Sequence, residues 1–126
     1  MEFPEDLKYV DSHEYLRVKG SAVTVGITAY AVDQLGDIVF VELPEEGSEF
    51  KQGDKLGTVE SVKAVEDLIA PVSGRVTSIN TEVVDEPSAI GDDPYGDGWL
   101  VKIELSDNEE LDELLTSEEY REQIGD

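Results

Sequence analysis

Apolar and polar residues alternate along several short stretches of the chain, and glycine or proline separates most of these stretches from one another. Many stretches are rich in β-branched residues, so the pattern favours a small β-sandwich or barrel over a helical fold. The alternation is clearest at residues 99–105, whose inward face would hold Trp99, Val101, Ile103 and Leu105. The predicted strands span residues 15–18, 22–27, 38–43, 55–61, 64–69, 74–80 and 99–105.

Helical signals replace the alternation near residue 30 and near the C-terminus. Residues 29–35 contain no turn signal and stop at Gly36, which predicts a short helix with a glycine stop. Leucines recur at helical spacing close to the end of the chain, and we expect two short helices there, at about 107–124. Two residue pairs fit a capping box, namely Ser106 with Glu109 and Thr116 with Glu119.

The size and composition fit one globular unit. A chain of 126 residues can bury one hydrophobic core but not a second independent one, so we expect residues 1–126 to form a single domain. The expected fold class is mostly β with short helices. Because the chain has no cysteine, any sulfur chemistry must come from a bound group.

The charge restricts the partners. Nine Lys and Arg residues stand against 31 Asp and Glu residues, which gives a net charge of −22. A surface this acidic argues against nucleic acid and against an anionic membrane, and its self-repulsion favours a monomer in dilute solution. The N-terminal residues do not resemble a leader and the longest apolar run is far too short to span a membrane, so we expect a cytoplasmic protein.

One lysine occupies a distinctive position. Turn signals bound a strand-rich segment at about 53–74, and Lys63 lies near its middle, where the two strands of a hairpin would meet. A lysine at such a tip could be acylated without disturbing the core, and the flanking Val62 and Ala64 would leave an enzyme access to it. Position alone does not distinguish Lys63 from the other five lysines, which we expect to be ordinary surface residues.

The residues around Lys63 resemble a known family. Glu-Ser-Val-Lys-Ala at 60–64 and Ala-Pro-Val-Ser-Gly at 70–74 are similar to the lipoylation segment of glycine cleavage H proteins, in which the lysine carries lipoic acid in amide linkage. Tyr15 departs from the tryptophan common in the family, and Val65-Glu66 from small or polar residues. Further segments resemble the family at its own spacing, at residues 13–16, 25–28, 35–44 and 93–100.

The resemblance implies a lipoyl/biotinyl-type β-sandwich, or barrel-sandwich hybrid, with a lipoyl group on Lys63. It also implies that an attaching enzyme recognises the residues beside the lysine, which are Glu60, Ser61, Val62 and Ala64. Such a protein is a non-catalytic shuttle that takes an aminomethyl group from a pyridoxal-phosphate glycine decarboxylase to a tetrahydrofolate-dependent aminomethyltransferase. The other implied partners are a dihydrolipoamide dehydrogenase and the lipoate-attaching enzyme.

H proteins are thought to shelter the loaded arm in a surface cleft, and an ammonium-like group there needs hydrogen-bond acceptors. Our candidates are Ser12, Glu14 and Asp67. His13 is the only histidine and lacks the partners for a zinc site or a hydrolytic triad. We therefore expect no metal site and no catalytic residue.

Three alternatives stay open at this point. A biotinyl carrier shares the lysine-on-a-hairpin plan but usually has methionines on both sides of the lysine, where this chain has Val62 and Ala64. A lipoyl domain of a 2-oxo-acid dehydrogenase would lack the segment at 13–16 and the C-terminal helices. An H-like protein could also relay lipoyl groups to other acceptors or serve another pathway, and no residue in the sequence excludes that role.

The acidic surface generates a first prediction. Carboxylates spread over the whole length repel one another, and mobile ions screen this repulsion, as they would in a high-salt cytoplasm. We expect the midpoint of thermal unfolding to rise between dilute buffer and molar salt. A melt with no gain in stability would contradict the hypothesis.

Overall fold

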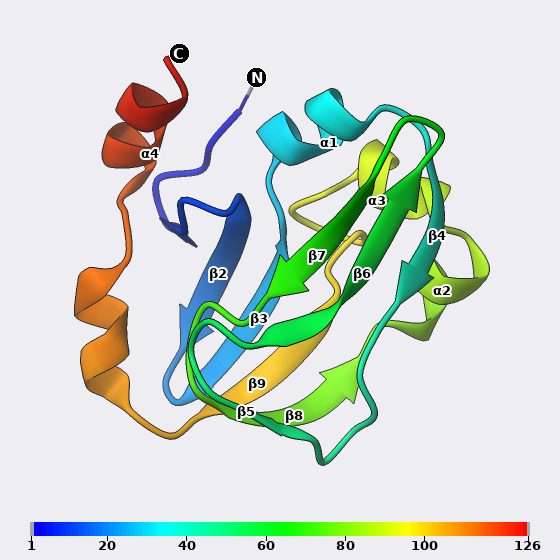
Figure 1. Cartoon of the computed structure of the whole chain (residues 1–126). Coiled ribbons are helices and arrows are strands. Elements are labelled where there is room, and N and C mark those ends of the chain that lie inside the picture. The colour runs from blue at the N-terminus through cyan, green and yellow to red at the C-terminus, as the bar shows by residue number, and fades with distance from the viewer. Residues whose placement is uncertain (1, 126) are drawn as a thin grey trace.

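The computed structural model describes residues 2–125 and arranges the strands in two sheets that face each other across a shared core (Figure 1). The larger sheet has the strand order β1-β2-β3-β9-β8-β5, and the smaller sheet has the order β4-β6-β7. The mostly β fold predicted from the alternation is thus confirmed. The strands are β1 Lys8–Tyr9, β2 Glu14–Lys19, β3 Ala22–Ile27, β4 Ile38–Glu42, β5 Glu49–Phe50, β6 Lys55–Ser61, β7 Val65–Ile69, β8 Gly74–Ile79 and β9 Val101–Leu105.

Short helices connect and cover these strands. The first begins after Thr28, whose side chain accepts a hydrogen bond from the Ala31 amide, and ends at Gly36 with a positive φ of 77°, as the glycine stop predicts. No helix within residues 2–125 has the length and apolar character needed to cross a membrane. The helices are α1 Ala29–Leu35, α2 Thr81–Asp85, α3 Ser88–Asp92, the 3₁₀ helix η1 Asn108–Glu113 and α4 Ser117–Ile124.

Several details of the prediction were wrong at the ends of elements. Asn80 does not extend β8 but caps α2, because its side chain accepts a hydrogen bond from the Glu82 amide. Trp99 lies outside β9 and is half-buried, with its ring beneath the Lys102 ammonium at 4.9 Å. Asp107 rather than Ser106 caps η1, whereas Thr116 and Glu119 form the expected capping box.

The sequence did not predict β1, β5, α2 or α3. The two strands contain only two residues each, and the two helices only five, so none is long enough to display a period. Each depends on its neighbours in space. The strand β5 pairs with β8, and β1 pairs with β2.

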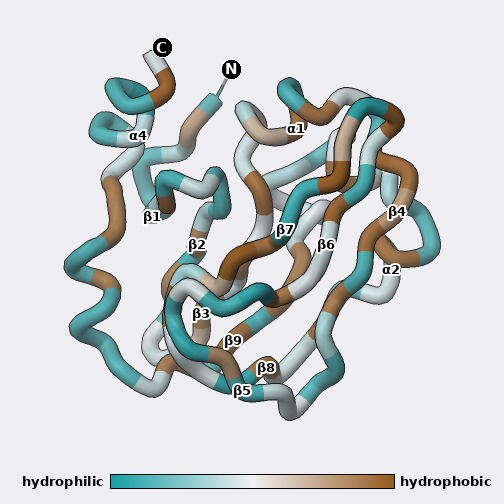
Figure 2. Tube along the Cα trace, in the orientation of Figure 1, coloured by the Kyte–Doolittle hydropathy of each residue, from teal (hydrophilic) through white to brown (hydrophobic). Residues whose placement is uncertain are grey.

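The main core lies between the two sheets. Val23, Val25 and Ile103 from the larger sheet are buried against residues such as Val59 and Leu68 from the smaller one. Figure 2 shows hydrophobic segments on strands of both sheets, whereas the C-terminal segment is largely hydrophilic. Burial of apolar side chains from both sheets is the main force that holds them together.

A second, aromatic cluster attaches the C-terminal helix to the N-terminal segment, and both lie beside the start of β2 (Figure 1). The rings of Tyr9 and Tyr120 stack with centroids 5.0 Å apart, and Phe3 meets the Tyr120 ring edge-on at 5.4 Å. Backbone hydrogen bonds between Tyr9 and Leu115 add a short bridge. The cluster therefore fixes α4 close to the residues that precede β2.

Candidate functional site

The strands β6 and β7 form an antiparallel hairpin whose turn contains Lys63. Glu60 pairs with Val65, so the hairpin closes immediately beyond these two residues. The buried Ser61 hydroxyl accepts hydrogen bonds from the amides of Lys63 and Ala64, each at 3.1 Å. The Ser61 amide also donates to the Ala64 carbonyl at 2.8 Å. Ser61 thereby defines the shape of the turn that presents the lysine.

The turn is braced from one side by the segment between α1 and β4. The Val62 amide donates to the Asp37 carbonyl at 3.1 Å. The side chain of the exposed Lys63 extends over Gly36, and a Cβ atom built on this glycine would lie 3.5 Å from Lys63 Cε. The backbone around Lys63 is thus held in place while its amine stays open to solvent.

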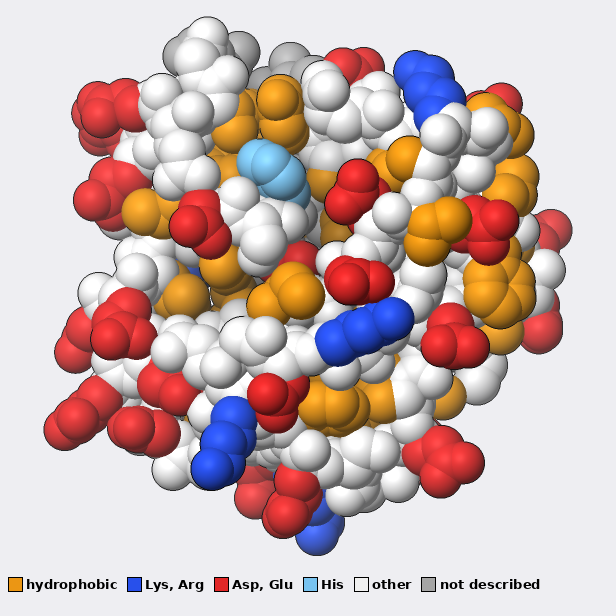
Figure 3. All heavy atoms as spheres, in the orientation of Figure 1, with side chains coloured by type: hydrophobic (Ala, Val, Ile, Leu, Met, Phe, Trp, Pro, Cys, Tyr) orange, Lys and Arg blue, Asp and Glu red, His pale blue; other side chains and the backbone are white. Residues whose placement is uncertain are grey.

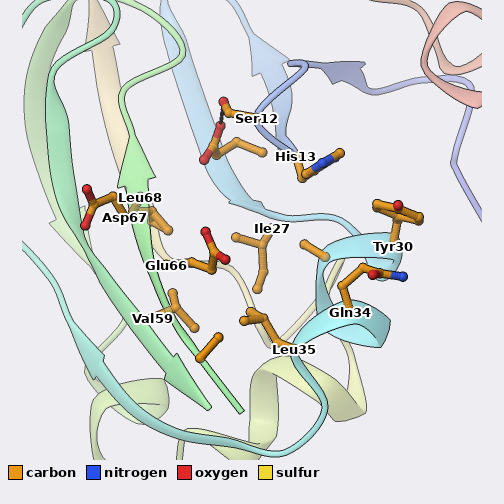
Figure 4. Close-up of a pocket in the computed structure, with 13 residues that line it drawn as sticks. Ser12, His13, Ile27, Tyr30, Gln34, Leu35, Val59, Glu66, Asp67 and Leu68 are labelled. Carbon is orange, nitrogen blue, oxygen red and sulfur yellow. Dashed lines mark hydrogen bonds between the residues drawn. The ribbon is translucent and has the colours of Figure 1, made fainter. Parts of the chain in front are cut away.

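A cavity of about 420 Å³ lies between the hairpin, α1 and the residues that lead into β2 (Figure 4). Its walls combine two chemical characters. The apolar lining consists of Ile27, Ala31, Leu35, Val59, Ala64 and Leu68. The polar lining consists of Ser12, His13, Glu14, Tyr30, Gln34, Glu66 and Asp67, so all three cleft residues expected from the sequence lie on this cavity.

Glu14 is the buried acid of the cavity, with a side chain only 1% exposed. The Ser12 hydroxyl donates to one of its carboxylate oxygens, and the Ile69 amide donates to the other at 3.3 Å. Burial raises the pKa of the Glu14 carboxyl from its ordinary value of 4.5 to about 7, although these hydrogen bonds oppose the rise. Glu14 is therefore poised between its neutral and ionised forms near neutral pH.

His13 connects this cavity to the C-terminal helix. Its Nδ1 atom lies 2.7 Å from the Tyr120 hydroxyl, which in turn lies 2.8 Å from the Thr28 hydroxyl. His13 also has a positive φ of 74°, a conformation in which non-glycine residues are uncommon. Burial lowers the pKa of its imidazole, which favours the neutral ring. Local sequence patterns cannot predict this connection, because His13 and Tyr120 are 107 residues apart in the chain.

Glu66 and Asp67 are neighbours on β7 whose side chains point in opposite directions (Figure 4). Glu66 points toward the middle of the cavity. Asp67 points away from it, and its carboxylate lies 3.3 Å from the Lys55 ammonium in an exposed ion pair. Alternation along the strand could have identified Glu66, since it shares a face with the buried Leu68.

The cavity suits a flexible organic group more than a metal ion. Within residues 2–125, no three His, Cys, Asp or Glu side chains are grouped as ligands for a metal. The apolar walls can pack against a hydrocarbon chain, and the Ser12, Glu14 and Glu66 oxygens can accept hydrogen bonds from a polar end. The adjacent Lys63 amine offers a covalent attachment point for such a group.

Comparison with known proteins gives a consistent set of matches. Residues 7–126 match the family model described as glycine cleavage H-protein. The chain is 63% identical to the glycine cleavage system H protein of Gloeobacter violaceus, with 98% of this chain and 97% of that protein covered. It is 54% identical to the probable glycine cleavage system H protein of Haloarcula marismortui, with 96% and 95% covered.

A solved structure agrees with these matches. The crystal structure of a glycine cleavage system H protein from Mycobacterium marinum superposes on this chain with a TM-score of 0.90 at 45% sequence identity. The superposition covers 98% of this chain and 99% of that one. The similarity therefore extends over both sheets and the C-terminal helix rather than over the hairpin alone.

The raised pKa of Glu14 predicts a pH-dependent stability. Between pH 4.5 and about 7 the folded chain retains a proton that the unfolded chain has lost, so the free energy of unfolding falls as the pH rises. Glu14→Gln removes this penalty. As the pH rises from 5 to 8, we expect the free energy of unfolding of the variant to increase relative to that of wild type by on the order of 2 kcal/mol.

Urea unfolding at several pH values measures this effect. At pH 5 the wild-type carboxyl is mostly protonated, so the difference between the two proteins at that pH is the internal control. If the free energies of unfolding of wild type and variant changed in parallel from pH 5 to pH 8, the prediction would be contradicted.

Proposed function

The chain belongs to the glycine cleavage H-protein family, and on this premise we propose that Lys63 is the residue that carries the lipoyl group. As a member of this family, the protein is the carrier subunit that shuttles between components of the glycine cleavage system. The presentation of Lys63 on the tip of the β6–β7 hairpin is the observation that carries the proposal.

The surroundings of Lys63 support a role as an acylation site. The exposed Val62 and Ala64 leave room around the amine, while Ser61 fixes the turn through hydrogen bonds to the Lys63 and Ala64 amides. Glu60 lies one residue before this turn and is half-exposed. An attaching enzyme would therefore meet a rigid backbone with a mobile lysine, and we propose Glu60, Ser61, Val62 and Ala64 as its recognition residues.

The cavity beside the hairpin fits a lipoyl arm. When bound, the lipoyl group would supply a disulfide that accepts and releases the aminomethyl unit derived from glycine. The apolar walls formed by Ile27, Leu35 and Val59 would pack along the hydrocarbon part and exclude water. We propose that Ser12 and Glu14 accept hydrogen bonds from the charged amine at the far end.

The third cleft residue expected from the sequence is Asp67, and its neighbour Glu66 has the better orientation for the same task. Both residues line the cavity, but the Asp67 carboxylate faces Lys55 whereas the Glu66 carboxylate faces inward. We propose that Glu66 joins Ser12 and Glu14 at the polar end of the cleft. Asp67 would contribute there only if its ion pair with Lys55 opened.

The proposed partners follow from this carrier role. They are the pyridoxal-phosphate glycine decarboxylase, the tetrahydrofolate-dependent aminomethyltransferase, dihydrolipoamide dehydrogenase and the lipoate-attaching enzyme. The chain itself would bind, present and shelter the arm without a catalytic residue. The match over residues 7–126 and the high identity to H proteins favour this role over a biotinyl carrier or a 2-oxo-acid dehydrogenase domain.

The attachment site can be tested by Lys63→Arg. Arginine keeps the positive charge but cannot form the lipoyl amide, so we expect the variant to carry no lipoyl group and to support no glycine cleavage. Its free energy of unfolding should stay within about 0.5 kcal/mol of wild type, because the exposed tip contributes little packing. Intact mass spectrometry with fragmentation around residue 63 measures the modification.

Lys55→Arg is the matched control, since Lys55 lies on the same hairpin and is also exposed. It should be lipoylated and active like wild type. A biotinyl mass, a lipoyl group on another lysine, or activity retained by Lys63→Arg would each disprove the assignment.

The shelter is tested by the rate at which the glycine-loaded carrier loses its amine to water when the aminomethyltransferase is absent. Loss of a charge-assisted hydrogen bond should raise this rate, by roughly tenfold for Glu14→Gln and several-fold for Glu66→Gln. Asp67→Asn is the control from the opposite face of β7 and should leave the rate within twofold of wild type. An Asp67→Asn effect larger than that of Glu66→Gln would reverse the proposed orientation.

A further inference from the structure

The outer face of the β4-β6-β7 sheet carries exposed apolar side chains next to Lys63. Phe40 on β4 and Val65 on β7 both pair with Glu60 on β6, so all three side chains emerge from the same face in one row. Their exposed fractions are 49% for Phe40 and 60% for Val65. With the neighbouring Val39 and Val62, which are 51% and 69% exposed, they form what we call the tip patch.

The tip patch and the arm cavity lie on opposite faces of the same sheet. The next residue pair along the hairpin, away from the tip, is Val59 with Glu66. Both of these residues line the cavity. The side-chain alternation of strands places the row with Phe40 and Val65 on the other side. Lys63 lies in the turn at the end of the sheet, where the two faces meet. A protein bound to the tip patch would therefore reach the Lys63 amine without covering the cavity.

Exposed apolar groups at one end of such an acidic protein require an explanation. Figure 3 shows hydrophobic side chains gathered near β4 and the hairpin, with Asp and Glu side chains around them. Glu60 lies in the same row as Phe40 and Val65, and the Asp37 carbonyl accepts a hydrogen bond from the Val62 amide. Exposed apolar side chains gathered on one face, with carboxylates between and beside them, are typical of a protein-binding surface. The complementary partner would have an apolar centre and a basic rim.

We propose that the tip patch is the docking surface for the enzyme that attaches the lipoyl group to Lys63. This inference rests on the proposed function of Lys63. In the attachment step, the neutral amine attacks the carbonyl carbon of a lipoyl group activated as an anhydride with AMP. The C–N amide bond forms, the C–O bond to AMP breaks, AMP leaves with the bonding electron pair, and the nitrogen gives its proton to a base.

Geometry favours the attaching enzyme over the other partners. The reacting carbonyl must come within about 3–3.5 Å of the lysine nitrogen, so this enzyme must touch the hairpin tip itself. Enzymes that work on the far end of the arm can remain one arm length away from the tip. A second copy of this chain is disfavoured as the occupant, because each copy has a net charge of −22 and carboxylates lie between and beside the patch residues.

The test uses Phe40→Ser and Val65→Ser with Val84→Ser as the matched control. Val84 is another exposed valine, on α2, with an exposed fraction of 43%. The apo proteins are incubated with lipoate, ATP and a purified ATP-dependent lipoate-attaching enzyme, and initial rates are followed by intact mass. We expect kcat/KM to fall about tenfold for the two patch variants, mainly through KM, and to change less than twofold for Val84→Ser.

The outcomes separate this inference from the proposed function. If wild-type chain gains no lipoyl group at residue 63, the proposed function fails and the inference fails with it. If wild type is lipoylated and the patch variants are lipoylated equally fast, only the docking inference fails. Thermal melts and circular dichroism check that each variant is folded. Because two positions are substituted separately, the test still gives a result if one of the two variants fails to fold.

A second measurement assigns the surface to a partner. Variants lipoylated to completion at high enzyme concentration are reduced by NADH in the presence of dihydrolipoamide dehydrogenase, and we expect the kcat/KM of this reaction to stay within twofold of wild type. A fall equal to that in the attachment reaction would overturn the assignment to the attaching enzyme. Light scattering that shows wild-type dimers but monomeric patch variants would overturn it in favour of a second copy.

Discussion

The antiparallel register of β6 and β7 is the constraint on which the rest of the site depends. Side chains alternate between the two faces of a strand, so a register slip of one residue would move the side chains of the slipped strand to the other face. In the observed register, Val59 and Leu68 enter the core while Glu60 and Val65 face outward. The turn held by Ser61 ends this register at Lys63, so one pairing pattern decides the core, the cavity wall and the place of the lysine together.

The polar end of the cavity depends on a second set of contacts. Glu14 is buried by the junction of β2 with β7, where the Ile69 amide reaches its carboxylate. A carboxyl in this position is costly to ionise alone, but an ammonium group beside it would stabilise the ionised form. The same acid that lowers the stability of the folded chain as the pH rises is therefore suited to hold a cationic end of the proposed arm. The His13–Tyr120 hydrogen bond extends this wall to α4.

The sequence predicted those parts of the structure that depend on local patterns. The strand β6 and the helix α1 were predicted with the observed bounds, because alternation marks one and a glycine stop ends the other. The burial of Glu14 was beyond local reasoning, since the residues that enclose it come from another sheet. The prediction of Asp67 rested on the need for a hydrogen-bond acceptor just beyond Lys63. Alternation along β7 favours Glu66 instead, because Glu66 shares a face with the buried Leu68.

A carrier must present one residue to several proteins and still protect the group attached to it. In the proposed function, the two faces of the β4-β6-β7 sheet would meet these two needs separately. The inward face borders a cavity that has apolar residues in its walls, while the outward face leaves apolar side chains exposed beside the same lysine. The chain has no cysteine, and this absence suits the proposed lipoyl group, because a nearby thiol could exchange with its disulfide. The strong negative charge opposes self-association at the exposed apolar face, so the surface can stay open for partners of opposite charge. The carboxylates near this face therefore oppose association between copies of the chain, even though apolar area is exposed beside Lys63.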